Sequence, residues 1–96
     1  MTALEELQRH RDELLAIAAK HGATNVRVFG SAVRGEESPD SDVDFLVDFA
    51  DDRGFDDLLA MMEAFEAVLG RHVDIVFSRS ISPHFRPYIE AEARPL

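Results

Sequence analysis

The sequence predicts an α/β fold in which helices pack against a small mixed β-sheet of about three strands. Three short apolar runs, at residues 25–29, 42–49 and 73–77, have the length of strands. Helical patterns separate these runs, one helix precedes the first, and another follows the last. This β-α-β-α-β order is typical of a single α/β domain, which we expect to cover residues 1–96.

Composition limits the class of protein. The 96 residues are 46% apolar, which is enough for one modest core, and none is cysteine. A disulfide framework or a thiolate metal site is therefore excluded, in keeping with a reducing compartment. The sequence has neither an apolar run of membrane-spanning length nor an N-terminal signal peptide pattern. We expect a soluble cytoplasmic protein.

The net charge of −9 indicates which ligands suit the surface. Tight nucleic-acid binding depends on cationic side chains that face phosphates, so we expect no direct nucleic-acid partner. A nucleotide that carries its own metal ion fits better, because the cation bridges the acidic protein and the anionic ligand.

The first helix is expected to begin at Thr2, where Glu5 completes a capping box. Apolar residues then recur at helical spacing to about His21, and Gly22 offers a left-handed end to the helix. We interpret this stripe as core, and we expect one continuous helix.

The stretch from residue 26 to 49 carries most of the chemistry. A strand at 25–29 runs into Gly30 and Ser31, and a short helix is expected at 31–34. Such a turn directs backbone N–H groups at one point, which favours a phosphate. The Ser31 hydroxyl can donate to the same group. Arg34 has two open roles: it can grip phosphate oxygens, or it can form a surface ion pair with Glu36 or Glu37.

Asp42 and Asp44 lie two residues apart on the expected strand at 42–49, so their side chains share one face. Val43, Phe45 and Val47 are expected to face the opposite way, onto helices. Two carboxylates beside a phosphate cradle provide the oxygen ligands that Mg²⁺ prefers when it also holds substrate phosphates. An ordinary hairpin with a solvated acidic edge is the alternative explanation.

The second half of the chain adds one more carboxylate. An amphipathic helix is expected from Phe55 to Leu69, where Gly70 stops it. Asp74 lies inside the next apolar run, where a charge is costly unless it is paired or coordinated. Asp74 is therefore the candidate third metal ligand, and the alternative is pairing with Arg71 or Arg79. The last helix is expected to open at residues 82–83, with Phe85, Ile89 and Ala93 roughly on one face.

These motifs resemble a known signature. Gly30-Ser31, ten intervening residues and Asp42-Val43-Asp44 are similar to the GSx10DxD motif of the DNA polymerase beta-type nucleotidyltransferases. Within that superfamily the short chain resembles the minimal nucleotidyltransferases, MntA-like antitoxins that act beside HEPN toxins. Asp74 matches the third acidic residue of the superfamily.

The resemblance implies an enzyme that transfers a nucleoside monophosphate from an NTP, expected to be ATP, to a hydroxyl and releases pyrophosphate. Gly30, Ser31 and Arg34 would bind the nucleotide phosphates, as would Asp42 and Asp44 through a metal. Asp42, Asp44 and Asp74 would form the catalytic set and hold two Mg²⁺ ions, and Asp74 would take the proton of the acceptor.

The resemblance also implies the acceptor, a tyrosine on a cognate HEPN-family toxin whose RNase activity is blocked by AMPylation. Two other functions stay open at this point. One is an antitoxin that binds and masks its toxin without catalysis, and the other is a nucleotidyltransferase that modifies a small molecule such as an antibiotic. The larger superfamily members have an additional helical domain, so a partner or a second copy is expected to complete the site.

Overall fold

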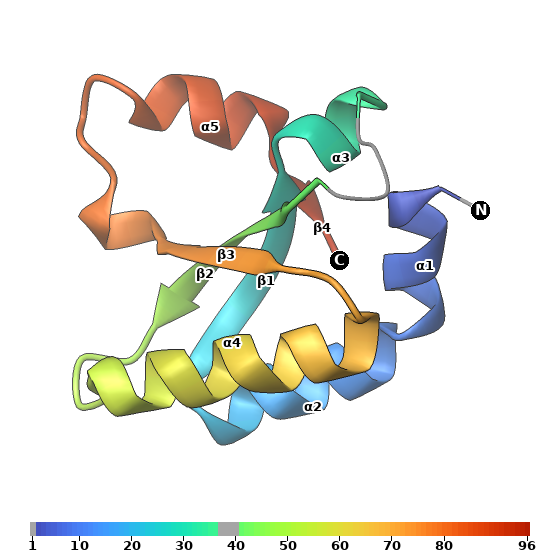
Figure 1. Cartoon of the computed structure of the whole chain (residues 1–96). Coiled ribbons are helices and arrows are strands. Elements are labelled where there is room, and N and C mark those ends of the chain that lie inside the picture. The colour runs from blue at the N-terminus through green and yellow to red at the C-terminus, as the bar shows by residue number, and fades with distance from the viewer. Residues whose placement is uncertain (1, 37–40) are drawn as a thin grey trace.

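The computed structural model describes residues 2–36 and 41–96 and has a mixed four-stranded sheet at its centre (Figure 1). The strands are β1 (Ala23–Phe29), β2 (Val43–Phe49), β3 (Val73–Phe77) and β4 (Arg94–Pro95), in the spatial order β3-β2-β1-β4. β2 is parallel to β3 and antiparallel to β1, and β4 is antiparallel to β1. The predicted α/β fold is confirmed. The fourth strand was not predicted, because two residues are too few to form a pattern.

β1 begins two residues earlier than predicted. Ala23 pairs with Phe49, but the register shifts between Thr24 and Arg27. Asn25 has a positive φ of 50°, which places it in the left-handed region that asparagine tolerates better than most residues. The irregularity interrupts the alternating pattern, so the sequence shows only the regular part of the strand.

The N-terminal segment forms two helices, α1 (Ala3–Arg9) and α2 (Arg11–Lys20), where the sequence predicted one. The capping box is confirmed: Thr2 Oγ1 accepts from the Glu5 N–H at 3.1 Å, and the Thr2 N–H donates to Glu5 Oε1 at 3.2 Å. His10 separates the helices, with φ −105° and ψ 14°. Apolar spacing continues across this break, which explains why it was missed.

The long helix α4 (Phe55–Leu69) ends at Gly70, whose φ of +68° matches the predicted stop. It lies beside α2 along one side of the sheet (Figure 1). The short helix α3 (Ser31–Arg34) follows β1, and a 3-10 turn, η1 (Ser78–Ser80), follows β3. The last helix, α5, covers Arg86–Glu92, so its predicted start at residue 82 was wrong.

One main core lies between the sheet and these helices. Val43, Phe45 and Val47 are fully buried in it, as predicted, and the Phe45 and Phe65 rings meet edge to face at 4.9 Å. Leu46 faces the other way and is also fully buried. Both faces of β2 are therefore covered along part of their length. No helix in the described part of the chain is long and apolar enough to cross a membrane.

Candidate active site

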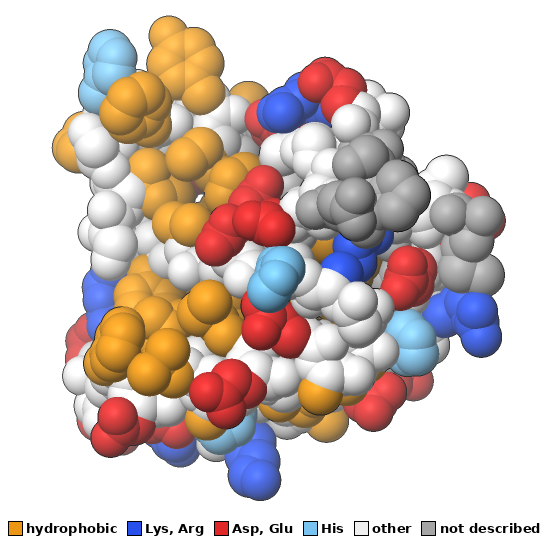
Figure 2. All heavy atoms as spheres, in the orientation of Figure 1, with side chains coloured by type: hydrophobic (Ala, Val, Ile, Leu, Met, Phe, Trp, Pro, Cys, Tyr) orange, Lys and Arg blue, Asp and Glu red, His pale blue; other side chains and the backbone are white. Residues whose placement is uncertain are grey.

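Two carboxylates meet across the parallel strands β2 and β3. Asp44 and Asp74 are direct partners in the register, so their side chains project from the same face of the sheet. Asp42 lies just before β2, two residues from Asp44, and shares its parity along the chain. In Figure 2, acidic side chains gather at the middle of this face.

The electrostatics of Asp44 reflect this crowding. Burial is the main factor that raises the pKa of the Asp44 carboxyl, and the negative charges of Asp74 and Asp42 raise it further. Nearby Arg34 acts in the opposite direction and lowers the pKa. The carboxylates therefore lie close enough to repel one another, which is the condition that a bound cation relieves.

Gly30 lies directly against this group. It follows Phe29, which is the partner of Asp44 in the antiparallel pairing of β1 with β2. Its φ of +82° and ψ of −153° are nearly closed to other residues. A Cβ built on Gly30 would overlap Oδ2 of Asp44. The absence of a side chain thus allows the turn and the carboxylate to approach each other.

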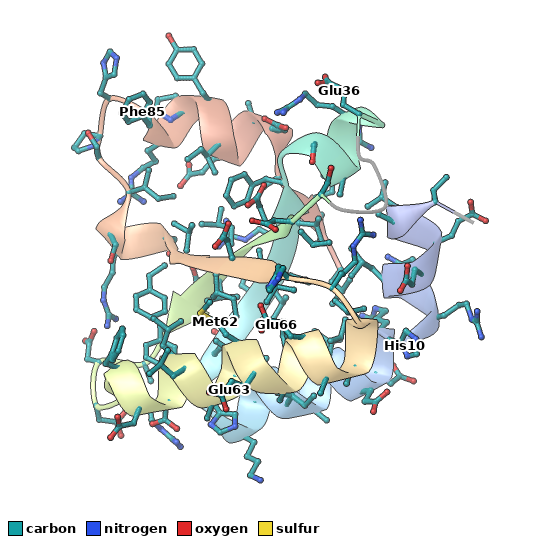
Figure 3. All side chains as sticks on the ribbon, viewed as in Figure 1. His10, Glu36, Met62, Glu63, Glu66 and Phe85 are labelled. Carbon is teal, nitrogen blue, oxygen red and sulfur yellow. The ribbon has the colours of Figure 1, made fainter. Side chains whose placement is uncertain are left out.

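Arg34, at the end of α3, is held by two carboxylates. Its Nε donates to Glu36 Oε1 at 3.0 Å, and its Nη1 donates to Glu92 Oε1 at 2.5 Å. The ion pair with Glu36 that sequence analysis weighed is therefore present, while Glu37 lies outside the described residues. Figure 3 shows Glu36 beside α3.

Glu92, the last residue of α5, is a site neighbour that sequence reasoning missed. Besides Arg34, its Oε1 accepts from the Gly30 N–H at 3.0 Å. The negative charge of Glu92 also contributes to the raised pKa of Asp44. Glu92 is 62 residues from Gly30 and belongs to no motif, so no signal in a single sequence could have revealed it.

The arginines considered as partners of Asp74 are engaged elsewhere. Arg79 Nη1 donates to the Phe49 carbonyl at 2.5 Å and to Asp51 Oδ1 at 2.7 Å. Arg71 Nη2 donates to the Ser41 carbonyl at 3.1 Å, next to Asp42. Asp74 itself is exposed, and no ion pair to it is found among the described residues.

The start of β3 is fixed by a side chain of α4. Glu66 points from α4 toward that strand (Figure 3), and its Oε2 accepts from the Val73 N–H at 3.0 Å. Between the starts of β2 and β3, the Val43 N–H donates to the His72 carbonyl at 3.0 Å. These contacts set the register that places Asp74 opposite Asp44.

Comparison with known proteins decides the family. The model of the nucleotidyltransferase domain family matches residues 7–96, which is nearly the whole chain. The chain belongs to the nucleotidyltransferase domain family. The resemblance stated from the motif and the predicted enzyme class, a nucleotidyltransferase, are thereby confirmed.

Relatives of this nucleotidyltransferase domain include proteins named for one activity. The protein adenylyltransferase MntA of Thermococcus cleftensis is 40% identical over 85 residues, which are 84% of this chain and 83% of that protein. A provisionally named protein adenylyltransferase of Methanocaldococcus jannaschii is 34% identical over 90 residues, 94% of each chain.

Solved structures share the fold. A provisionally assigned minimal nucleotidyltransferase superposes with a TM-score of 0.88 at 45% identity, covering 100% of this chain and 97% of the other. A toxin-antitoxin structure with AMP-PNP gives a TM-score of 0.74 at 20% identity, covering 88% of this chain and 69% of that one. At that identity the second likeness shows the fold alone.

The acidic groups of this nucleotidyltransferase domain suit a hard cation. Asp42, Asp44 and Asp74 provide only carboxylate oxygens, the ligand type that Mg²⁺ prefers. Burial is the main cause of the raised pKa of Asp44, and the charges of Asp74 and Asp42 raise it further, so a cation bound beside them would favour the ionised carboxylate. In the described ranges, no three acidic or histidine side chains already converge as metal ligands do. The donor chemistry therefore fits Mg²⁺, although the ligands are not preassembled.

Proposed function

We propose that this chain is a Mg²⁺-dependent protein adenylyltransferase, which transfers AMP from ATP to a tyrosine of a cognate HEPN-family toxin. The observation that carries the proposal is the register of Asp44 with Asp74 beside the Gly30 turn, in a chain of the nucleotidyltransferase family. We propose the cytoplasm, where ATP is present, as its location.

The transfer is a displacement at the α-phosphorus of ATP. The tyrosine oxygen forms a bond to that phosphorus, the bond to the bridging oxygen breaks, and pyrophosphate leaves. Asp74 is exposed on the same face as Asp44, so it can accept the proton that the tyrosine loses. Most of the rate enhancement comes from orientation and charge neutralisation.

The residues around Gly30 orient the nucleotide. The donors that would contact phosphate oxygens are the Gly30 N–H, the Ser31 hydroxyl and the Arg34 guanidinium. The first and the last of these donate to Glu92 in the structure. Arg34 lies near enough to Asp44 to lower its pKa, so phosphates held by Arg34 are adjacent to the acidic group. Asp42, Asp44 and Asp74 would hold Mg²⁺, which supplies positive charge to the phosphate oxygens when it is bound.

Two observations support a protein acceptor. The relatives described above, at 34% and 40% identity, are named protein adenylyltransferases. In addition, large apolar side chains are exposed on α4 and around α5: Phe55 (68%), Leu59 (41%), Phe85 (58%) and Tyr88 (71%). Figure 2 shows hydrophobic side chains above and below the acidic group. Exposed apolar surface of this kind is typical of a protein-binding face.

The decisive experiment distinguishes modification from masking. A candidate HEPN-family toxin is incubated with a substoichiometric amount of this protein, ATP and Mg²⁺, and the intact mass of the toxin is measured. We expect one adenylyl group per modified tyrosine, with many toxin molecules modified by each enzyme. The inhibition of the RNase should persist after the enzyme is removed.

Matched variants identify the residues responsible. Asp44→Asn should reduce transfer by about 100-fold or more, because even the loss of outer-shell partners of metal sites costs about 10–100-fold. Asp52→Asn makes the same charge change at an exposed position of the loop before α4 and should retain activity. Full inhibition of the toxin without added mass would show a masking antitoxin instead.

A further inference from the structure

One oxygen atom holds two of the groups assigned to the nucleotide phosphates. Oε1 of Glu92 accepts from the Gly30 N–H at 3.0 Å and from Arg34 Nη1 at 2.5 Å. These donors come from the end of β1 and from α3, whereas Glu92 ends α5, at the other end of the sequence. The carboxylate occupies the position that an anionic ligand of both donors would take.

We propose that Glu92 is a built-in competitor of the nucleotide: its carboxylate occupies the phosphate-binding donors in the free protein and leaves them when the triphosphate binds. The proposal rests on the proposed function, because that function assigns Gly30 and Arg34 to the phosphates. It adds Glu92, which lies outside the motif that runs from Gly30 to Asp44.

A phosphate oxygen can bind the Gly30 N–H only if Glu92 leaves it. The Gly30 N–H has a single proton, so an acceptor that takes it displaces the one already there. Carboxylate and phosphate oxygens make the same kind of charge-assisted bond to a guanidinium. The Glu92 side chain is 26% exposed, which leaves space for it to rotate toward solvent.

Charge adds to the competition. A triphosphate that arrives beside Glu92 brings further negative charge to the same donors. The nucleotide and Glu92 therefore compete for the same two donors. The apparent Kd for the nucleotide equals the intrinsic Kd divided by the fraction of molecules in which these donors are free.

The alternative explanation is that Glu92 orients Arg34 for the phosphates, as a positioning residue would. The two roles predict opposite effects. If Glu92 competes, its removal raises nucleotide affinity, but if it positions Arg34, its removal lowers that affinity.

The test measures binding of ATP with Mg²⁺ by calorimetry in the wild type, Glu92→Gln, Glu92→Ala and the control Glu90→Gln. Glu92→Gln keeps a side-chain oxygen that can accept from the Gly30 N–H, but it lacks the negative charge. Glu90 lies on the same helix and pairs with Arg86 at 3.4 Å, away from Gly30. We expect about tenfold tighter binding for Glu92→Gln, as follows from weakening a charge-assisted hydrogen bond. Glu92→Ala should bind at least as tightly, and Glu90→Gln should match the wild type.

A second readout separates this inference from the proposed function. Sodium tripolyphosphate is titrated into ¹⁵N-labelled protein, and the Gly30 amide resonance is followed. The resonance should move at lower tripolyphosphate concentration in Glu92→Gln than in the wild type. Tighter ATP binding without transfer to any toxin would contradict the proposed function and leave the competition intact. Unchanged or weaker ATP binding, or a Gly30 amide equally insensitive in both proteins, would overturn the competition.

Discussion

Gly30 and Asp44 approach so closely that a side chain at position 30 would overlap the Asp44 carboxylate. The contact joins the turn after β1 to the acidic group on β2, two regions that the motif places fourteen residues apart. The glycine therefore has two roles. It adopts a backbone conformation that other residues avoid, and it leaves the space in which Asp44 lies.

Gly30→Ala should consequently yield a protein that still folds but transfers the nucleotide far more slowly. Strain at such a φ costs about 1–3 kcal/mol, and displacement of the carboxylate should lower transfer by about 100-fold, as small misplacements at active sites do. Gly35→Ala is the matched control, because Gly35 also has a positive φ (+73°), but nothing lies within 4 Å of its added Cβ. It should lose a similar amount of stability and remain active. Equal activity of the two variants would contradict the role of the Gly30–Asp44 contact.

The acidic group should couple metal binding to stability. A ligand at 100 times its Kd stabilises by about 2.7 kcal/mol, which raises the melting temperature of a domain this small by about 10–20 °C. We expect ATP with Mg²⁺ to stabilise the wild type and to leave the double variant Asp42→Asn/Asp44→Asn unaffected. Without ligand, the double variant should be at least as stable as the wild type, since its substitutions remove repulsion. Thermal unfolding followed by circular dichroism measures both effects, and equal ligand-induced shifts would exclude the metal site.

Ser31 is expected to contribute to nucleotide binding and not to folding. It is only partly buried, and it is the first residue of α3, directly after Gly30. Loss of a hydrogen bond to a charged group costs about 1.5–3 kcal/mol, so Ser31→Ala should weaken ATP binding by about 10–100-fold. Ser80→Ala, at an exposed position in η1, should bind ATP as the wild type does. Calorimetry beside a circular dichroism spectrum tests this, and an unchanged affinity would reduce Gly30-Ser31 to a structural turn.

Most of the fold could be predicted because local patterns and tertiary structure agree. Val43, Phe45 and Val47 alternate as a strand with one buried face should, and Gly70 ends α4 where its backbone conformation requires glycine. The break at His10 could not be predicted. It interrupts the helix with neither proline nor glycine, and apolar residues continue on both sides.

The site was predictable to the extent that its residues are close in the sequence. Gly30, Ser31, Asp42 and Asp44 belong to one motif, and Asp74 is recognisable as a charge inside an apolar strand. Glu92 joins the site only because β4, which follows α5, pairs with β1 and holds the end of α5 beside Gly30 and α3. A two-residue strand and a long-range contact depend on tertiary packing, which a single sequence does not display.

Asp48 should make stability depend on pH at the other end of the sheet. Its Oδ1 accepts from Ser78 Oγ at 2.6 Å and from Arg27 Nη2 at 3.0 Å, and its Oδ2 accepts from Asn25 Nδ2 at 3.2 Å. The Ser78 hydrogen bond is the largest of the effects that hold the pKa of Asp48 below its ordinary value.

A lowered pKa fixes the sign of the dependence. Between the folded and unfolded pKa values the unfolded chain binds more protons, so stability rises with pH in that window. The contribution of Asp48 is present above about pH 4, the ordinary range of an aspartate, and is lost as the pH falls through its lower folded value. Asp48→Asn should therefore lower the free energy of unfolding by roughly 1 kcal/mol at neutral pH, as the loss of partly exposed charged pairs does.

The difference in unfolding free energy between Asp48→Asn and the wild type should shrink as the pH is lowered toward about 3. Urea unfolding of both proteins along this pH series measures it, with Asp52→Asn as the control for the change in net charge. A difference that stays constant from neutral to acidic pH would mean that the charge of Asp48 contributes nothing to holding β1, β2 and η1 together.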